Sequence, residues 1–180
     1  MTDRYPPRRF QRGSMATTVP DDQDDQPITL AGLHIDVLDG AFSWYIRSLD
    51  SVVSRDLDHR MAHLDIAKGK GKITTLLLVD DYPGVRPSQI AEVLMRDRPA
   101  TGRIIDRLVQ AGDIRRETAP EDQRAQALFI TEKGHALADE VRGIIREQEN
   151  EFFDFIAEED RAQFMRMLKR AYLNMRKKLE

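Results

Sequence analysis

The sequence contains no cysteine, and this absence narrows the chemistry that the chain can perform. A protein without thiols has no disulfide framework, no thiolate metal ligand and no thiol-based redox sensor. The sequence also lacks a glycine-rich phosphate loop, and no recognisable motif places a serine or a carboxylate for catalysis. We therefore predict that the protein is not an enzyme and uses no cofactor.

Long apolar runs are absent as well. The longest run near the middle of the chain is Leu76–Val79, far short of the ~20 residues that cross a bilayer. The N-terminus has no apolar core of the kind that a signal peptide needs. These absences, together with the missing cysteines, predict a cytoplasmic protein without a membrane anchor.

Positive charge is not in excess either. The chain has 28 lysines and arginines against 31 aspartates and glutamates, which gives a formal net charge of −3 and a pI near 5.9. No general positive field attracts nucleic acid, so any affinity for DNA must come from the local placement of arginine and lysine. The hydrophobic share, 41% of 180 residues, is sufficient for a sizeable core.

Residues 1–27 are rich in Arg, Pro, Asp and Gln and poor in large apolar side chains. Such a segment cannot bury enough apolar surface to offset the entropy that it loses on ordering, so we predict a disordered N-terminal arm. Its first part is basic and its second part acidic. Two interpretations stay open: an arm that contacts DNA phosphates, or a solvated tail. We expect residues 28–180 to form a single domain.

Helical patterns flank the middle of the chain. From Leu30 to about Leu57, apolar residues recur at helical spacing around much of the circumference, and no proline interrupts them. Such a helix must be covered on more than one side, and a second copy of the chain is the economical cover. Later, an amphipathic helix is predicted from Thr131 to about Ile156, and a final one over residues 164–179. We assign residues 28–67 and 131–180 to dimerisation.

The middle segment, Ser88–Gly134, has the order of parts of a winged helix-turn-helix: two short helices, a two-stranded hairpin and the start of another helix. A short apolar helix is predicted before it, over Ile73–Val79, because the glycines of residues 68–72 break the earlier pattern. Ser88 is the predicted N-cap of the first helix of the pair. Asp97 is the predicted N-cap of the second, whose first turn accommodates Pro99.

The second helix of the pair, predicted over Arg98–Ala111, has the pattern of a recognition helix. Gly112 suits the position just past its end. Its predicted buried line is Thr101, Ile104, Ile105 and Leu108. The residues left to face outward are Arg98, Ala100, Gly102, Arg103, Asp106 and Arg107. Recognition helices meet base edges with their N-terminal half, and long arginine side chains reach guanine or phosphate.

Two alternating strands are predicted next, Asp113–Glu117 and Gln126–Ile130, with a charged tip between them. The tip contains the triplet Asp122-Gln123-Arg124, and Thr131 and Gly134 follow the second strand. This triplet resembles the wing signature of the multiple-antibiotic-resistance-regulator (MarR) family. The run Arg-Ile-Ile-Asp-Arg-Leu at residues 103–108 resembles that family's recognition helix. With the flanking helices, the resemblance extends over about residues 30–179.

The resemblance implies a mainly α-helical protein with a small β-wing, organised as a homodimer whose terminal helices form the dimer base. Residues 73–130 are then the DNA-binding region, with recognition helices in successive major grooves of a pseudo-palindromic double-stranded operator and wings at the minor grooves. The resemblance also implies that Arg124 enters the minor groove and that Asp122 holds it by a charge-assisted hydrogen bond. The residues predicted to contact DNA are Ser88, Gln89, Arg98, Pro99, Ala100, Arg103, Arg107, Asp122, Gln123 and Arg124.

The sequence departs from the family at one place. Many relatives carry small hydroxyl residues where this chain has Arg98, Ala100 and Gly102. The operator sequence therefore cannot be borrowed from relatives, because contacts to phosphate or bases are lost here and a charged one is gained.

The family also implies a repressor that a small molecule, often an aromatic or lipophilic acid, releases from DNA. Trp44, Tyr45 and Arg47 are candidate ligand-binding residues, because they offer aromatic walls and a cation for a carboxylate. Packing in the core is the other interpretation of the two aromatic residues.

Two alternatives remain. His59 and His63 are four residues apart, as two metal ligands on one helix face would be, with Asp56 and Asp65 nearby, so a metal-responsive regulator is a second hypothesis. The acidic total charge leaves a third, a helical interaction protein that never binds DNA.

Overall fold

The computed structural model describes residues 28–35, 38, 40–67, 69–119 and 122–179, without the side chains of residues 119 and 122–125. The chain divides into two compact units. One unit is Gly40–Glu151, and the other combines the described residues before Gly40 with Phe152–Glu180. The predicted disordered arm, residues 1–27, lies outside the described residues.

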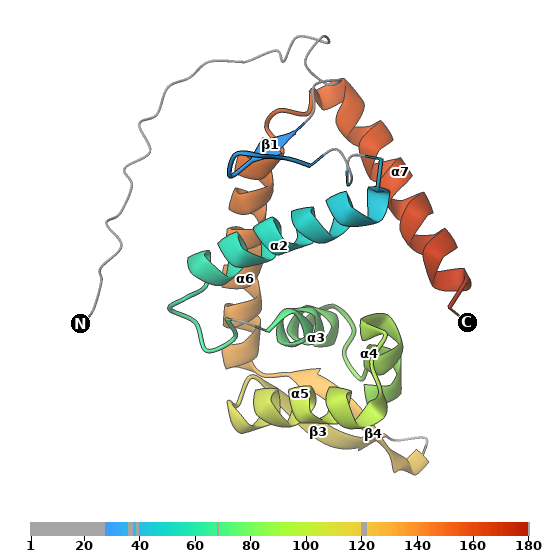
Figure 1. The fold of residues 1–180 in the computed structure, drawn as a ribbon. Helices are drawn as coiled ribbons and strands as arrows, with labels where there is room; N and C mark the ends of the chain where they lie inside the picture. Colours follow the sequence, from blue (N-terminus) through green and yellow to red (C-terminus); the bar gives the residue numbers. More distant parts are fainter. Residues whose placement is uncertain (1–27, 36–37, 39, 68, 120–121, 180) are drawn as a thin grey trace, which may run out of the picture. The chain divides into compact units, whose positions relative to one another are not determined.

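The protein is mainly helical with small antiparallel sheets, as the sequence predicts (Figure 1). The larger unit contains α2 (Phe42–Arg60), α3 (Lys70–Asp81), α4 (Pro87–Leu94), α5 (Arg98–Gln110), β3 (Ile114–Ala119), β4 (Asp122–Ile130) and all of α6 (Glu132–Phe152) but its last residue. The smaller unit contains β1 (Thr29–Leu30), β2 (Leu33–His34) and α7 (Glu158–Lys177). Among the described residues, no helix combines the length and the apolar character that crossing a membrane requires.

Helix α3 is the centre of the larger unit's core. Figure 1 shows it nearly end-on, with α4, α5 and β4 around it. The fully buried side chains include Leu76 and Val79 of α3, and the core continues through Ile90, Ile105, Leu108, Ile114, Leu128 and Val141. Burial of each such side chain contributes about 1.5–3 kcal/mol. The recognition helix and the hairpin are thus both anchored on α3.

The start of α3 differs from the prediction. The helix begins at Lys70, not at Ile73, so Gly71 lies inside it and is buried. A Cβ at Gly71 would lie 2.7 Å from Cδ1 of Ile104 on α5. The glycine is therefore not a break but the place where α3 comes close to the recognition helix.

The predicted long N-terminal helix over residues 30–57 is wrong in its first part. Helix α2 begins only at Phe42, and residues 29–34 form two short paired strands. The turn between these strands has positive φ at Ala31 (51°) and Gly32 (79°), a backbone conformation that ends helical periodicity. Apolar spacing alone therefore overestimated the helix.

Helices α2 and α6 are held together by polar contacts within the larger unit. Arg60 on α2 donates to Glu151 at 2.7 Å and to Asp56 at 2.6 Å, and these hydrogen bonds raise its pKa. The buried Gln148 of α6 donates from Nε2 to the carbonyl oxygen of Val53 at 2.9 Å. A buried amide is stable only when it is paired in this way. Helix α6 ends at Phe152, four residues short of the predicted end at Ile156.

Candidate nucleic-acid interface

The first helix of the pair, α4, starts earlier than predicted. Its N-cap is Arg86, with Pro87 as the first helical residue, so Ser88 is inside the helix and exposed rather than the cap. The side-chain Oε1 of Gln89 accepts the backbone N–H of Arg86 at 2.9 Å. This bond orients Gln89 at the start of the helix. Among the described residues, the amide N–H groups of Gln89 have no acceptor, so they stay free for a DNA contact.

The second helix, α5, is capped as predicted. Asp97 accepts the backbone N–H of Ala100 at 2.6 Å, and Pro99 occupies the first turn, where a missing N–H costs little. The hydroxyl of Thr101 donates to the backbone carbonyl of Asp97 at 3.0 Å, which satisfies this buried group. The turn before the cap passes through Met95 in the left-handed region, with φ of 52°.

The predicted two faces of α5 are confirmed. Thr101, Ile105 and Leu108 are buried, and Ile104 is half-buried against the core. The exposed residues are Arg98, Pro99, Arg103, Asp106, Arg107 and Gln110, while Ala100, Gly102 and Val109 are partly exposed. One long side of the helix is therefore available to a partner outside the larger unit.

The exposed side of α5 is locally positive although the whole chain is acidic. Its one acidic residue, Asp106, forms an ion pair with Arg116 of β3. In the part of the chain that the structure describes, the guanidinium groups of Arg98, Arg103 and Arg107 have no ion-pair partner. Free cations on an exposed helix suit phosphate oxygens or guanine edges, and moving them to DNA breaks no internal bond.

The end of α5 is tied to the start of α6. Gly112 adopts a positive φ of 76° and ends the helix, as predicted. The hydroxyl of Thr131 donates to the carbonyl of Gly112 at 2.7 Å and accepts the N–H of Gly134 at 3.0 Å. Lys133 donates to the carbonyl of Ala111 at 2.6 Å. Its ammonium group also forms an ion pair with the buried Asp113 at 2.9 Å.

Sequence analysis missed the role of Lys133. The pattern of α6 leaves this lysine on an exposed face, and nothing in its spacing marks it as a cap for a helix more than 20 residues earlier. A cation at a helix C-terminus compensates the carbonyl dipoles there. Lys133 therefore stabilises the end of the recognition helix.

The wing is an antiparallel hairpin in which Ile114 pairs with Ile130 and Arg116 with Leu128. Val85, before α4, bridges Leu128 as a short third partner of the hairpin. Both strands are longer than predicted, and the predicted triplet Asp122-Gln123-Arg124 opens β4. The side chains of the triplet lie outside the described residues, so their contacts to DNA stay a prediction.

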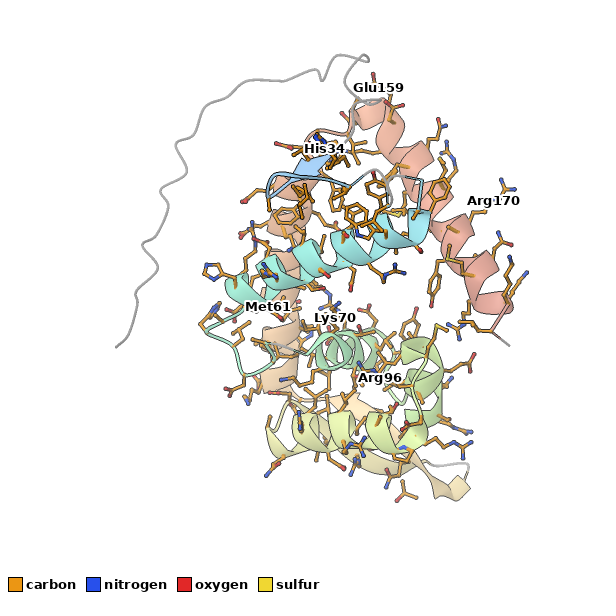
Figure 2. All side chains as sticks on the ribbon, viewed as in Figure 1. His34, Met61, Lys70, Arg96, Glu159 and Arg170 are labelled. Atoms are coloured by element: carbon orange, nitrogen blue, oxygen red, sulfur yellow. The ribbon has the colours of Figure 1, made fainter. Side chains whose placement is uncertain are left out.

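The candidate ligand residues lie on α2. Trp44 and Tyr45 are half-buried, and their rings meet edge to face with centroids 4.8 Å apart, while Arg47 is exposed. A hollow lies elsewhere. This cavity of about 360 Å³ is lined by Asp58, Gly69, Lys70, Gly71, Lys72, Arg96, Ile104 and Arg107. Lys70, at the start of α3, and Arg96, between α4 and α5, are labelled in Figure 2. Lys70 already pairs with Asp50 at 2.7 Å, and Lys72 donates to the carbonyl oxygen of Asp65 at 2.8 Å. The excess of positive charge in the lining, four cations to one carboxylate, still suits an anionic ligand.

The premise of the histidine metal site is wrong. Helix α2 ends at Arg60, so His59 and His63 do not share a helix face. His63 Nε2 instead lies 2.9 Å from Oε1 of Glu140 on α6. A different group could offer ligands: Asp80 of α3 with His135 and Asp139 of α6. Arg142 already donates to Asp80 at 2.6 Å and lies 3.2 Å from Asp139, so its guanidinium group occupies the place that a metal ion would take.

Hydrogen bonds in this cluster join α3 to α6, and they shift the pKa values of His135 and Asp80. The pKa of His135 is raised, first by its 2.7 Å hydrogen bond to Asp80 and then by the charges of Asp80 and Asp139. Burial raises the pKa of Asp80, but hydrogen bonds from His135 and Arg142 outweigh it, and the net pKa is lowered. Asp81 accepts a further bond from Arg142 at 2.7 Å.

We expect His135→Gln to destabilise the protein more at pH 5.5 than at pH 8.5. The His135 contribution is present in full below its ordinary pKa of 6.5 and is lost as the pH rises through the raised value. Asp80 remains ionised at both pH values because its pKa is lowered from 3.8. Urea unfolding midpoints at the two pH values check this. The exposed His59, changed to Gln, is the matched control, and equal losses from His135→Gln at both pH values would contradict the expectation.

Comparison with known proteins agrees with this geometry. The model of the MarR family matches residues 71–125, from the start of α3 into the wing. The chain is also similar in structure to CouR, a transcriptional repressor solved with a 23-mer DNA duplex, with a TM-score of 0.70 and 23% identity. The match covers 78% of this chain and 98% of CouR.

Two further similar structures contain DNA. A putative MarR family transcriptional regulator from Listeria monocytogenes, solved with a 26-mer DNA, matches with a TM-score of 0.70 and 19% identity, over 76% of this chain and 90% of that one. FabT of Streptococcus pneumoniae, in complex with DNA, matches with a TM-score of 0.66 and 20% identity, over 77% and 96% of the two chains. At these identities the likeness shows the fold alone.

Proposed function

We propose that the protein is a homodimeric transcriptional regulator of the MarR family. The match of that family's model to residues 71–125, from the start of α3 into the wing, supports this proposal. It binds a pseudo-palindromic operator in double-stranded DNA in the cytoplasm, and a small ligand releases it. One dimer places two recognition helices in successive major grooves, about 34–36 Å apart. Repression is the mode that the family resemblance favours.

The proposal rests on the exposure of three arginines on α5 and on their lack of ion-pair partners. Arg98, Arg103 and Arg107 are exposed and, within the described residues, unpaired, whereas the neighbouring Asp106 is neutralised by Arg116. A protein with a net charge of −3 needs such a local concentration of free cations to bind a polyanion.

The dimer is supported by apolar surface on the helices at both ends of the domain. On α2, Phe42 is 86% exposed, and Ile46, Leu49 and Val52 are at least half exposed at helical spacing. None of the residues of α7 is buried, and its exposed apolar side chains are Phe164, Met165, Met167, Leu168, Tyr172, Leu173 and Met175. Apolar faces of this extent are unfavourable in water, and a second copy of the chain covers them.

A ligand acts by binding the DNA-competent and DNA-incompetent forms of the dimer with different affinity. Trp44, Tyr45 and Arg47 stay the predicted ligand residues. The cavity beside Lys70, Arg96 and Arg107 supports an acidic effector, because an anion there would compete with DNA for the charge of Arg107.

The proposal is tested by selecting bound fragments from a DNA library and measuring the affinity of the Arg124→Ala variant for them. We expect Arg124→Ala to weaken binding strongly, because the tip of the wing is proposed to enter the minor groove. The dimer should stay intact in analytical ultracentrifugation, because the apolar faces proposed for dimerisation are on α2 and α7. Gln126→Ala, an exposed change on the same strand, is the control and should bind as the wild type does. If the wild type selects no fragment at low salt, the protein is not a DNA-binding regulator.

A further inference from the structure

Gly102 is an unfavourable residue for its position. It lies inside α5, five residues from the N-cap, where glycine weakens a helix relative to alanine. A Cβ added at Gly102 would meet no atom within 4 Å. Packing among the described residues therefore does not require a glycine here. The contrast is Gly71, which is also helical but has Ile104 against it.

The surroundings of Gly102 belong to the proposed DNA-binding surface. Arg98 precedes it by one helical turn and Asp106 follows by one turn, so the three residues form a row along the helix. Asp106 is paired with Arg116 of β3, which places this row on the side of α5 that faces the wing. The next residue, Arg103, is exposed. Gly102 thus lies next to the exposed Arg98 and Arg103, on the side of α5 that faces the wing.

We propose that Gly102 is the point of closest approach between the recognition helix and a base-pair edge in the major groove. This inference rests on the proposed DNA-binding function. The missing side chain lets the backbone of α5 come within van der Waals distance of the edge, so Gly102 determines which base pairs are accepted there. The loss of helix stability is offset only when DNA is bound. A steric contact of this kind affects the specific sequence and leaves non-specific phosphate binding unchanged.

The test compares Gly102→Ala with Gly143→Ala, a second helical glycine whose added Cβ also meets nothing within 4 Å. Gly143 lies in α6, outside the helix-turn-helix. Both variants should raise the melting temperature by about 2–4 °C, because alanine is the better helix former. Only Gly102→Ala should lose affinity for the selected duplex, by roughly tenfold or more. Its affinity for a scrambled duplex and its salt dependence should match the wild type.

Each outcome decides a different question. Wild-type affinity of Gly102→Ala for the selected duplex would overturn the inference and leave the proposed function standing. Equal losses of Gly102→Ala on the selected and scrambled duplexes, or a lower melting temperature, would show a distorted helix and would also overturn it. A wild-type protein that selects no duplex would overturn both. A repeat selection with Gly102→Ala that recovers a changed base preference would locate the contacted base pair.

Discussion

Replacing Gly134 by alanine is expected to lower the free energy of unfolding by about 3 kcal/mol and to impair DNA binding. Gly134 is buried in the first turn of α6. An added Cβ would overlap the carbonyl oxygen of Asp113 and lie 2.7 Å from its carbonyl carbon. Backbone atoms cannot rotate away as the end of a side chain can, so either α6 or the turn after α5 must move.

The movement would reach the recognition helix. Asp113 directly follows Gly112, and the same turn is held by Thr131 and Lys133. Urea unfolding and affinity for the selected duplex measure the two effects. Gly143→Ala, in the same helix but in open space, should instead be neutral or stabilising. A Gly134→Ala protein as stable as the wild type would show that α6 and the turn are not closely packed.

Arg103→Ala is expected to weaken binding to the selected duplex by about 5- to 150-fold, which corresponds to about 1–3 kcal/mol. Arg103 is exposed on α5, and no ion pair within the described residues depends on it. Its removal should therefore leave the unfolding free energy unchanged within about 0.5 kcal/mol. The loss is specific to DNA because the guanidinium group is free until DNA is bound.

A salt titration distinguishes a contact of Arg103 with a phosphate from a contact with a base. If Arg103 binds a phosphate, the slope of log affinity against log salt concentration should fall by about one in Arg103→Ala. If it binds a base, the slope should stay and the base preference should relax. Arg146→Ala, an exposed arginine on α6, is the matched control. Equal affinities of the two variants for the selected duplex would show that Arg103 does not contact DNA.

Local sequence patterns predicted the helix-turn-helix in detail. The cap at Asp97, the proline in the first turn and the positive φ at Gly112 depend on short-range rules, and all three are confirmed. The buried line of α5 follows from a 3.6-residue period, because one side of the helix must lie on a core. The MarR family resemblance depends on the same segment.

Patterns were weaker where a glycine could have several roles. The glycines of residues 68–72 predicted a break in the helix, yet Gly71 is inside α3. The residue there is a glycine because Ile104 leaves no room for a side chain. Apolar spacing predicted a helix over residues 30–57, but the turn at Gly32 separates two paired strands before α2 begins. At Gly71 the deciding contact is made with α5, and at Gly32 it is a local turn with positive φ; apolar periodicity contains neither.

The sequence by itself determined the class of fold and the two faces of the recognition helix, because these depend on neighbouring residues and their spacing. Only the tertiary structure decided which charges are free. Asp106 and Arg116 are ten residues apart and pair across α5 and β3, whereas Arg98, Arg103 and Arg107 have no such partner among the described residues. It also brought Lys133 to the end of the recognition helix. Ion pairs depend on distances of a few ångströms in space, and the fold sets those distances.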